Sequence, residues 1–171
     1  PGSLRRVEGR VTIAGEFLRR TDAPDDARLL HRRPGLDDPF PAALEALLDP
    51  ASPPMRWAVV RGAEADARLA LELARRRRDR LIVVTGQPDA DALLADLAPV
   101  LGTLLADMTP AQRRIARAIL VDGRRQSEVA DALGISRPSV SVAHARAHVR
   151  EAALLLRAIR ATWAAGLALR D

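Results

Sequence analysis

One stretch, from Gln126 to His148, constrains the fold of this chain more than any other part of the sequence. It reads QSEVADALGISRPSVSVAHARAH and divides into two short helical segments around one glycine. Gly134 can adopt the left-handed backbone conformation that ends a helix in a sharp turn. Ser136 is a candidate N-cap for the second segment, and Pro138 falls in its first turn, where a missing N–H is harmless. This spacing predicts a helix-turn-helix.

The apolar positions indicate how the two helices would pack. Val129, Ala130 and Leu133 share one face of the first helix, and Ala130 is small enough for the second helix to cross it. We expect Ile135 to fill the angle between the helices and Val140 to turn inward. The rest of the second helix is then left for an exposed face, which comprises Arg137, Ser139, Ser141, Val142 and Arg146.

A further amphipathic helix is predicted just upstream. Thr109 is its candidate N-cap, Pro110 its first residue, and Gln112 completes a capping box. Ile115 and Ile119 share its apolar face. A helix, a short glycine turn and then a two-helix motif resembles the DNA-binding region shared by sigma-factor region 4 and response-regulator output domains. This resemblance implies a double-stranded DNA partner.

The distribution of charge agrees with an anionic partner. Residues 1–106 hold 16 Arg and 16 acidic residues, whereas residues 107–171 hold 11 Arg and 6 acidic residues. The whole net charge of +5 therefore lies in the C-terminal part. A locally basic surface is the electrostatic footprint of a phosphate-binding face.

We predict two groups of DNA-binding residues. The exposed face of the second helix is expected to meet base edges or nearby phosphates, with Arg137 able to pair with guanine and Val142 able to touch a thymine methyl group. A second group, at the start of the first helix of the pair, is expected to hold the DNA backbone. It consists of Arg124, Arg125 and Gln126.

Composition narrows the remaining function classes. The chain has no Cys, which excludes disulfides, thiolate nucleophiles and the usual structural zinc sites. No apolar run approaches the roughly 20 residues that span a bilayer, and no segment resembles an export signal. We therefore expect a cytoplasmic protein that does not contact membranes.

No catalytic or metal-binding constellation is evident in the sequence. His144 and His148 lie four residues apart on the expected second helix, but no metalloprotease-type glutamate accompanies them. We expect one of them to pack or to contact phosphate. The chain is accordingly predicted to be a binding protein with no catalytic residues, metal or cofactor, and not an enzyme.

The N-terminal half predicts a small α/β domain. We expect strand or hairpin structure over 7–17, loop with some helix over 18–38, and a short helix over 41–48. A strand over 56–61, a helix over 63–80 and a strand buried on both faces over 81–85 follow. A helix over 88–108, kinked or restarted at Pro99, is expected to run into Thr109 as a rigid connector. The helix expected over 63–80 carries four consecutive arginines near its end. These residues, Arg75 to Arg78, are an alternative nucleic-acid contact.

The order of these elements, with the residues AGEF, RWAVVRG and TPAQ before the two-helix motif, resembles the SatD family of small bacterial proteins. The resemblance implies a nucleotidyl-cyclase-like or palm-like N-terminal domain joined to a helix-turn-helix. The family's GDEF-like hairpin is reduced here to Gly15-Glu16-Phe17, one acid short, so the palm is expected to be degenerate. We expect Glu16 to be a turn or surface carboxylate.

The last predicted helix, over 149–169, is apolar on nearly all sides. One stripe contains Ala152, Leu156, Ile159 and Trp163, and the opposite side contains Leu154, Leu155, Ala158 and Ala165. Such a helix must be covered on more than one face. Packing onto the N-terminal domain is one interpretation, and a homodimer interface is the one we favour, because it would place two recognition helices about one DNA turn apart.

The sequence therefore predicts an α+β chain with two domains. Residues 4–106 form the degenerate palm-like domain, and residues 107–171 form an all-α helix-turn-helix domain with a C-terminal dimerisation helix. The predicted function is a sequence-specific transcriptional regulator of bacterial type, open to a small-molecule or nucleotide effector. The alternative is a nucleotide-binding sensor or residual cyclase-like domain coupled to a helix-turn-helix that binds proteins.

Overall fold

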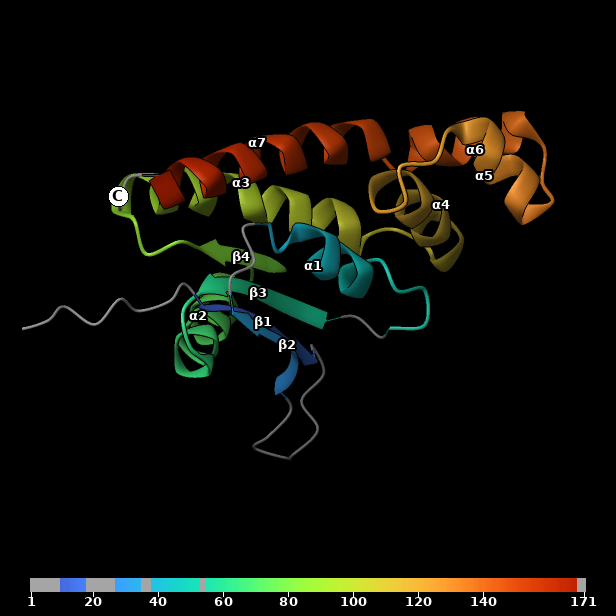
Figure 1. Cartoon of the computed structure of the whole chain (residues 1–171). Coiled ribbons are helices and arrows are strands. Elements are labelled where there is room, and N and C mark those ends of the chain that lie inside the picture. Colours follow the sequence, from blue (N-terminus) through green and yellow to red (C-terminus); the bar gives the residue numbers. More distant parts are fainter. Residues whose placement is uncertain (1–9, 18–26, 35–37, 53–54, 169–171) are drawn as a thin grey trace, which may run out of the picture.

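The structure, a computed structural model, describes residues 10–17, 27–34, 38–52 and 55–168. These residues form a mixed α+β fold (Figure 1). In chain order the elements are β1 (Arg10–Phe17), β2 (Ala27–Pro34), α1 (Phe40–Leu47), β3 (Met55–Arg61), α2 (Glu64–Arg77), β4 (Leu81–Val84), α3 (Pro88–Ala106), α4 (Pro110–Leu120), α5 (Gln126–Leu133), α6 (Arg137–Arg146) and α7 (Val149–Ala168). The predicted α+β class is confirmed.

The strands form one four-stranded sheet in the order β2-β1-β3-β4. β1 runs antiparallel to β2 and β3, whereas β3 and β4 are parallel and are joined through α2. α2 covers one face of the sheet, and α1, α3 and α7 lie over the other (Figure 1). The sheet is thus mixed, and the palm-like arrangement stays a prediction.

The short strand β4 behaves as its sequence predicts. Leu81 and Val83 are buried in the core beneath α3 and α7, and Ile82 is buried in the second core beneath α2. A continuous β-branched and leucine run suits a strand with both faces covered. β3, the strand that pairs with β4, also pairs with β1. There, Val59 of β3 lies opposite Ile13 of β1.

Three expectations for the N-terminal half are wrong. β2 lies in the segment expected to be loop with some helix, because its backbone pairs with β1, a long-range contact that local composition does not encode. α2 ends at Arg77, because Arg78 adopts a left-handed conformation with φ 62°. α3 ends at Ala106, before the expected end at Met108, so it does not run into Thr109, the residue that caps the separately predicted α4. The residues before Arg10 in the first predicted strand lie outside the described residues.

α3 packs unusually close to the sheet. A Cβ atom at Gly102 would lie 2.6 Å from the Cβ of Leu81 and 2.7 Å from its backbone nitrogen. α3 also continues through Pro99, and Thr103 Oγ1 donates a hydrogen bond to the Pro99 carbonyl oxygen at 3.0 Å. Gly102 therefore allows α3 to lie close against β4, and Pro99 does not end the helix.

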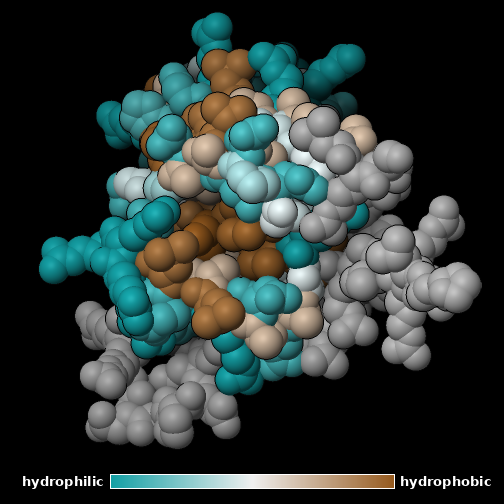
Figure 2. All heavy atoms as spheres, turned by 90° about the vertical axis from the view of Figure 1, so that its left-hand side faces the viewer, coloured by the Kyte–Doolittle hydropathy of each residue, from teal (hydrophilic) through white to brown (hydrophobic). Residues whose placement is uncertain are grey.

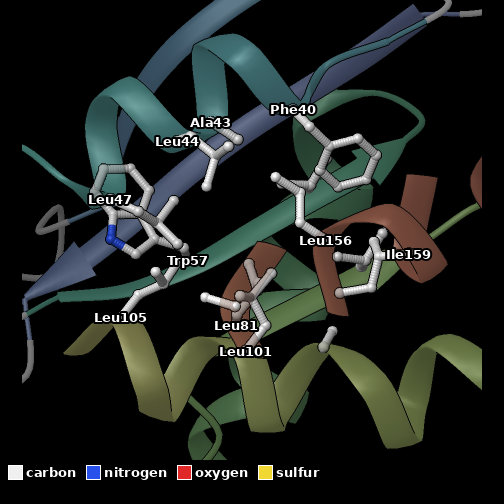
Figure 3. Close-up of a cluster of buried hydrophobic side chains, with 14 of the residues drawn as sticks. Phe40, Ala43, Leu44, Leu47, Trp57, Leu81, Leu101, Leu105, Leu156 and Ile159 are labelled. Carbon is white, nitrogen blue, oxygen red and sulfur yellow. The ribbon is translucent and has the colours of Figure 1, made fainter. Parts of the chain in front are cut away.

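α7 packs against its own chain. Its stripe of Ala152, Leu156, Ile159 and Trp163 is buried in the main core. Figure 3 shows side chains of α1, α3 and α7 meeting in this cluster, with Leu156 and Ile159 of α7 next to Phe40 and with Leu105 of α3 next to Trp57. The ring of Trp163 meets that of Phe40 edge-on, with 5.8 Å between the ring centres. This stripe is consequently covered by its own chain, as the first interpretation expected, and a dimer interface on the rest of the helix stays a prediction.

The main core also crosses the predicted domain boundary. It includes Met108, Ala116 and Ala147 together with the residues of α7, β1 and β3. At the end of the sheet, Arg160 of α7 donates from Nε to Asp38 Oδ2 at 2.9 Å and so ties α7 to the start of α1. None of the described helices is long and apolar enough to cross a membrane.

Candidate nucleic-acid interface

α4, α5 and α6 share a small core of their own. Ile115, Val129, Ala130 and Val140 are buried together, with half-buried side chains such as Ile119 around them. Each helix contributes residues at helical spacing, so the three helices are fixed to one another by apolar contact. The group lies beyond one end of the α3 and α7 pair (Figure 1).

The start of α4 is capped as the sequence predicts. The backbone N–H of Gln112 donates to Thr109 Oγ1 at 3.3 Å, and that of Thr109 donates to Gln112 Oε1 at 2.8 Å. This reciprocal capping box satisfies two of the N–H groups that a helix start leaves without partners. α4 therefore begins at a defined residue.

The turn between α5 and α6 also follows the predicted chemistry. Gly134 has φ 64° and ends α5, and the N–H of Ile135 donates to the Ala130 carbonyl at 3.1 Å. Ser136 Oγ then accepts from the N–H of Ser139 at 3.2 Å and caps α6. The turn thus satisfies backbone groups at the end of one helix and at the start of the next.

α5 begins without a conventional side-chain cap. Arg125 occupies the N-cap position, and Glu128 Oε2 accepts a hydrogen bond from its backbone N–H at 2.7 Å. A carboxylate in the first turn also interacts favourably with the helix dipole. The guanidinium group of Arg125 is left exposed to solvent.

Two packing predictions for this region are wrong. Leu133 and Ile135 were each expected to be apolar contacts, but both are 42% exposed. The small core is formed by Ile115, Val129, Ala130 and Val140, and neither Leu133 nor Ile135 packs against it.

The predicted DNA-binding residues lie on the surface. Gln126 is half-buried, and the others are exposed: Arg124, Arg125, Arg137, Ser139, Ser141, Val142 and Arg146. Because Val140 faces inward and anchors α6, the side chains around it must face solvent. The structure therefore leaves this face of α6 and the start of α5 accessible.

The arginines of this surface have little compensating charge. Among the described residues, neither Arg137 nor Arg146 has a salt-bridge partner. Arg124 Nε lies 3.9 Å from Asp122 Oδ2, a long, exposed contact of small energetic weight. The surface can thus offer guanidinium groups to an anionic partner.

The two histidines do not form a pair on one helix. α6 ends at Arg146, and His148 has φ 51° in the short connection to α7. Its Nδ1 lies 3.9 Å from Glu151 Oε2. The expectation that both histidines lie on the second helix is wrong, because the left-handed residue breaks the helical repeat between them.

Arg113 is a residue whose role the sequence did not reveal. Its Nη1 donates to the Ser52 carbonyl at 3.3 Å, and its Nη2 donates to the Ala106 carbonyl at 3.4 Å. It joins α4 to the connection that follows α1 and to the last residue of α3. An arginine in an amphipathic helix is usually a solvated residue, so no local signal distinguished it.

Glu16 is neither a turn residue nor a surface carboxylate. It lies within β1, its side chain is 12% exposed, and it forms ion pairs with Arg56, at 3.5 Å, and with Arg75. The hydrogen bond with Glu16 raises the pKa of Arg75 above its ordinary value. Arg75 is therefore paired with a residue of the sheet, and only the rest of the alternative arginine cluster, Arg76 to Arg78, lies outside this contact.

The described residues contain no group of three or more His, Cys, Asp or Glu side chains that could hold a metal.

Comparison of the chain with protein-family models, with curated proteins and with solved structures finds no match. The SatD resemblance therefore stays a prediction.

Proposed function

We propose that this protein is a sequence-specific, double-stranded DNA-binding regulator of transcription that uses α4, α5 and α6 as a helix-turn-helix. The observation that carries the proposal is the face of α6 around Arg137, Ser141 and Arg146, which is exposed and lacks salt-bridge partners among the described residues. A helix fixed by a small core and bearing free guanidinium groups has the shape and charge for a major groove.

The start of α6 supplies the groups for reading bases. Arg137 is the first residue of the helix, and its planar guanidinium group can donate two hydrogen bonds to O6 and N7 of guanine. Ser139 and Ser141 can donate to or accept from either kind of base edge. Val142, half exposed, can contact a thymine methyl group.

The start of α5 supplies the groups for holding the DNA backbone. Arg124 and Arg125 precede the helix, and Gln126 is its first residue. Free N–H groups and the positive end of the helix dipole favour phosphate at such a position. These contacts would set the orientation of α6 in the groove without reading sequence.

Selection from a random duplex library with the full chain tests the proposal. We expect enrichment of a defined motif, and we expect Arg137→Ala to lose part of that motif. Arg77→Ala on α2, an exposed arginine far along the chain from α6, is the matched control and should enrich the same motif as the wild type. Recovery of no common sequence, or of the same motif from Arg137→Ala, would refute base reading by α6.

A further inference from the structure

The outer surface of the α3 and α7 pair is apolar, and none of the residues that the structure describes covers it. The two helices lie side by side (Figure 1), with Gly166 of α7 next to Ala90 of α3. On the side away from the core, Leu93 is 58% exposed, Val100 51% and Leu154 48%. Figure 2 shows the molecule from the end at which α3 begins. Over the α3 and α7 pair, apolar side chains interrupt the polar surface, and a second apolar group lies lower, towards α2. Large side chains gathered in this way usually mark an interface.

The outward positions of the two helices share one spacing. Both stripes repeat at intervals of four, three and four residues, the pattern of helices that pack knobs into holes. The stripe of α3 carries the larger side chains and that of α7 mostly the smaller ones. The stripe of α3 consists of the exposed Leu93 and Val100 with the half-buried Leu97 and Leu104, and Leu97 also packs against the main core. The stripe of α7 consists of exposed residues, Leu154, Ala158, Ala161 and Ala165. Large residues on one surface facing small residues on another interdigitate well.

The charges beside the stripes are complementary. On α3, Asp96 follows the outer edge of the apolar stripe, and Asp107 continues that edge just beyond the helix. On α7, Arg150 and Arg157, seven residues apart, follow the opposite edge. None of these four side chains has a salt-bridge partner among the residues that the structure describes. Glu151, the other charged residue near the start of α7, faces His148.

We propose that this surface, the α3–α7 outer face, binds a second copy of the chain. α3 and α7 run antiparallel, so a two-fold axis parallel to them would place α3 of each copy against α7 of the other. Counted from the contact of Ala90 with Gly166 at 1.5 Å per residue, Asp96 lies about 9 Å and Arg157 about 14 Å along the pair. These levels are within reach of an arginine side chain, so acidic and basic edges would meet in both halves of the dimer.

This symmetry has a consequence for DNA, and that consequence alone rests on the proposed function. α4, α5 and α6 lie beyond one end of the helix pair (Figure 1), and an axis parallel to the pair keeps both copies of them at the same end. One duplex could then meet two α6 helices, as two-fold DNA-binding proteins require.

The test measures the mass of the full chain by light scattering, without DNA. We expect a dimer for the wild type, and a dissociation constant raised about tenfold or more by Val100→Glu, which places a charge in the apolar stripe. Leu69→Glu on α2 is the matched control, because Leu69 is also exposed but lies on the other face of the sheet, and it should leave the dimer unchanged. Circular dichroism checks that the exposed substitutions preserve the fold.

A charge exchange locates the contact. Asp96→Arg alone and Arg157→Asp alone should each weaken the dimer, and the two together should restore it. A wild type that is monomeric at every concentration overturns the proposal, as does a dimer lost in Leu69→Glu but kept in Val100→Glu, or a double variant no better than the single ones. Because no DNA is present, each result is independent of whether α6 binds DNA.

Discussion

Arg137 and Arg125 are expected to contribute to DNA binding in different ways. Arg137 stands at the first position of α6 and is assigned to a base edge, whereas Arg125 precedes α5 and is assigned to phosphate. A good bidentate contact with a base discriminates by about 1–3 kcal/mol, while a phosphate contact supports all sequences alike.

We therefore predict that Arg137→Ala weakens binding to the preferred duplex by about 1–3 kcal/mol and relaxes the preference at one base pair. Arg125→Ala should weaken binding to every duplex and reduce the salt dependence by about one unit. Titrations of both variants with the preferred duplex and its single-base variants measure this. Uniform losses for Arg137→Ala on all duplexes would contradict its assignment to a base.

Individual residues also show where sequence-based inference succeeded. Thr109, Gly134, Ser136 and Val140 have the roles predicted for them, because each role depends on local backbone geometry or on helical spacing. The roles of Glu16 and Arg113 were missed, since Arg56, which pairs with Glu16, and Ser52, which accepts from Arg113, lie 40 and 61 residues away in the chain.

At the level of single elements, two glycines are required for different reasons. Gly134 has φ 64°, but nothing lies within 4 Å of a Cβ atom placed there, so only its backbone conformation demands glycine. Gly102 in α3 is the reverse case, because a Cβ atom there would collide with the backbone of Leu81.

Replacement by asparagine should therefore affect stability differently at the two glycine positions. Asn tolerates the left-handed conformation better than Ala. We predict that Gly134→Ala lowers the free energy of unfolding by about 1–2 kcal/mol and that Gly134→Asn recovers part of the loss. At Gly102, Asn should be worse than Ala, because overpacking grows with side-chain size. Denaturant unfolding of the four variants checks the contrast, and the same ranking at both sites would contradict it.

Elements differed in how far the sequence defined them. β3, β4, α1, α4 and α7 were predicted near their observed bounds, since each has a clear period or a proline or glycine at an end. β2 was missed because its existence depends on pairing with β1, and the end of α3 was predicted two residues late because the apolar spacing continues to Met108. The separate start of α4 at Pro110 was predicted from its capping residues. The buried stripe of α7 was identified correctly, but which chain covers it was decided by Phe40 and α3, far away in the sequence.

At the scale of the whole molecule, the main core joins the α/β part to α7. Trp57 of β3 and Trp163 of α7 are buried in the same cluster. A shared core favours unfolding in one cooperative step. We predict that a Trp57→Phe variant, in which Trp163 is the only fluorophore of its type, unfolds with the same midpoint by fluorescence and by circular dichroism at the helical band. Two separated midpoints would show that α7 detaches before the helices lose their structure.

Salt dependence of DNA binding tests the central claim most directly. Four arginines of the proposed interface are expected to contact duplex DNA: Arg124, Arg125, Arg137 and Arg146. Each neutralised phosphate releases about 0.9 counterion, so the logarithm of the affinity of the full chain for its selected duplex should fall against the logarithm of salt concentration with a slope of about −3 or steeper. An affinity that does not change with salt, or no binding to any duplex at low salt, would contradict a DNA-binding surface on α5 and α6.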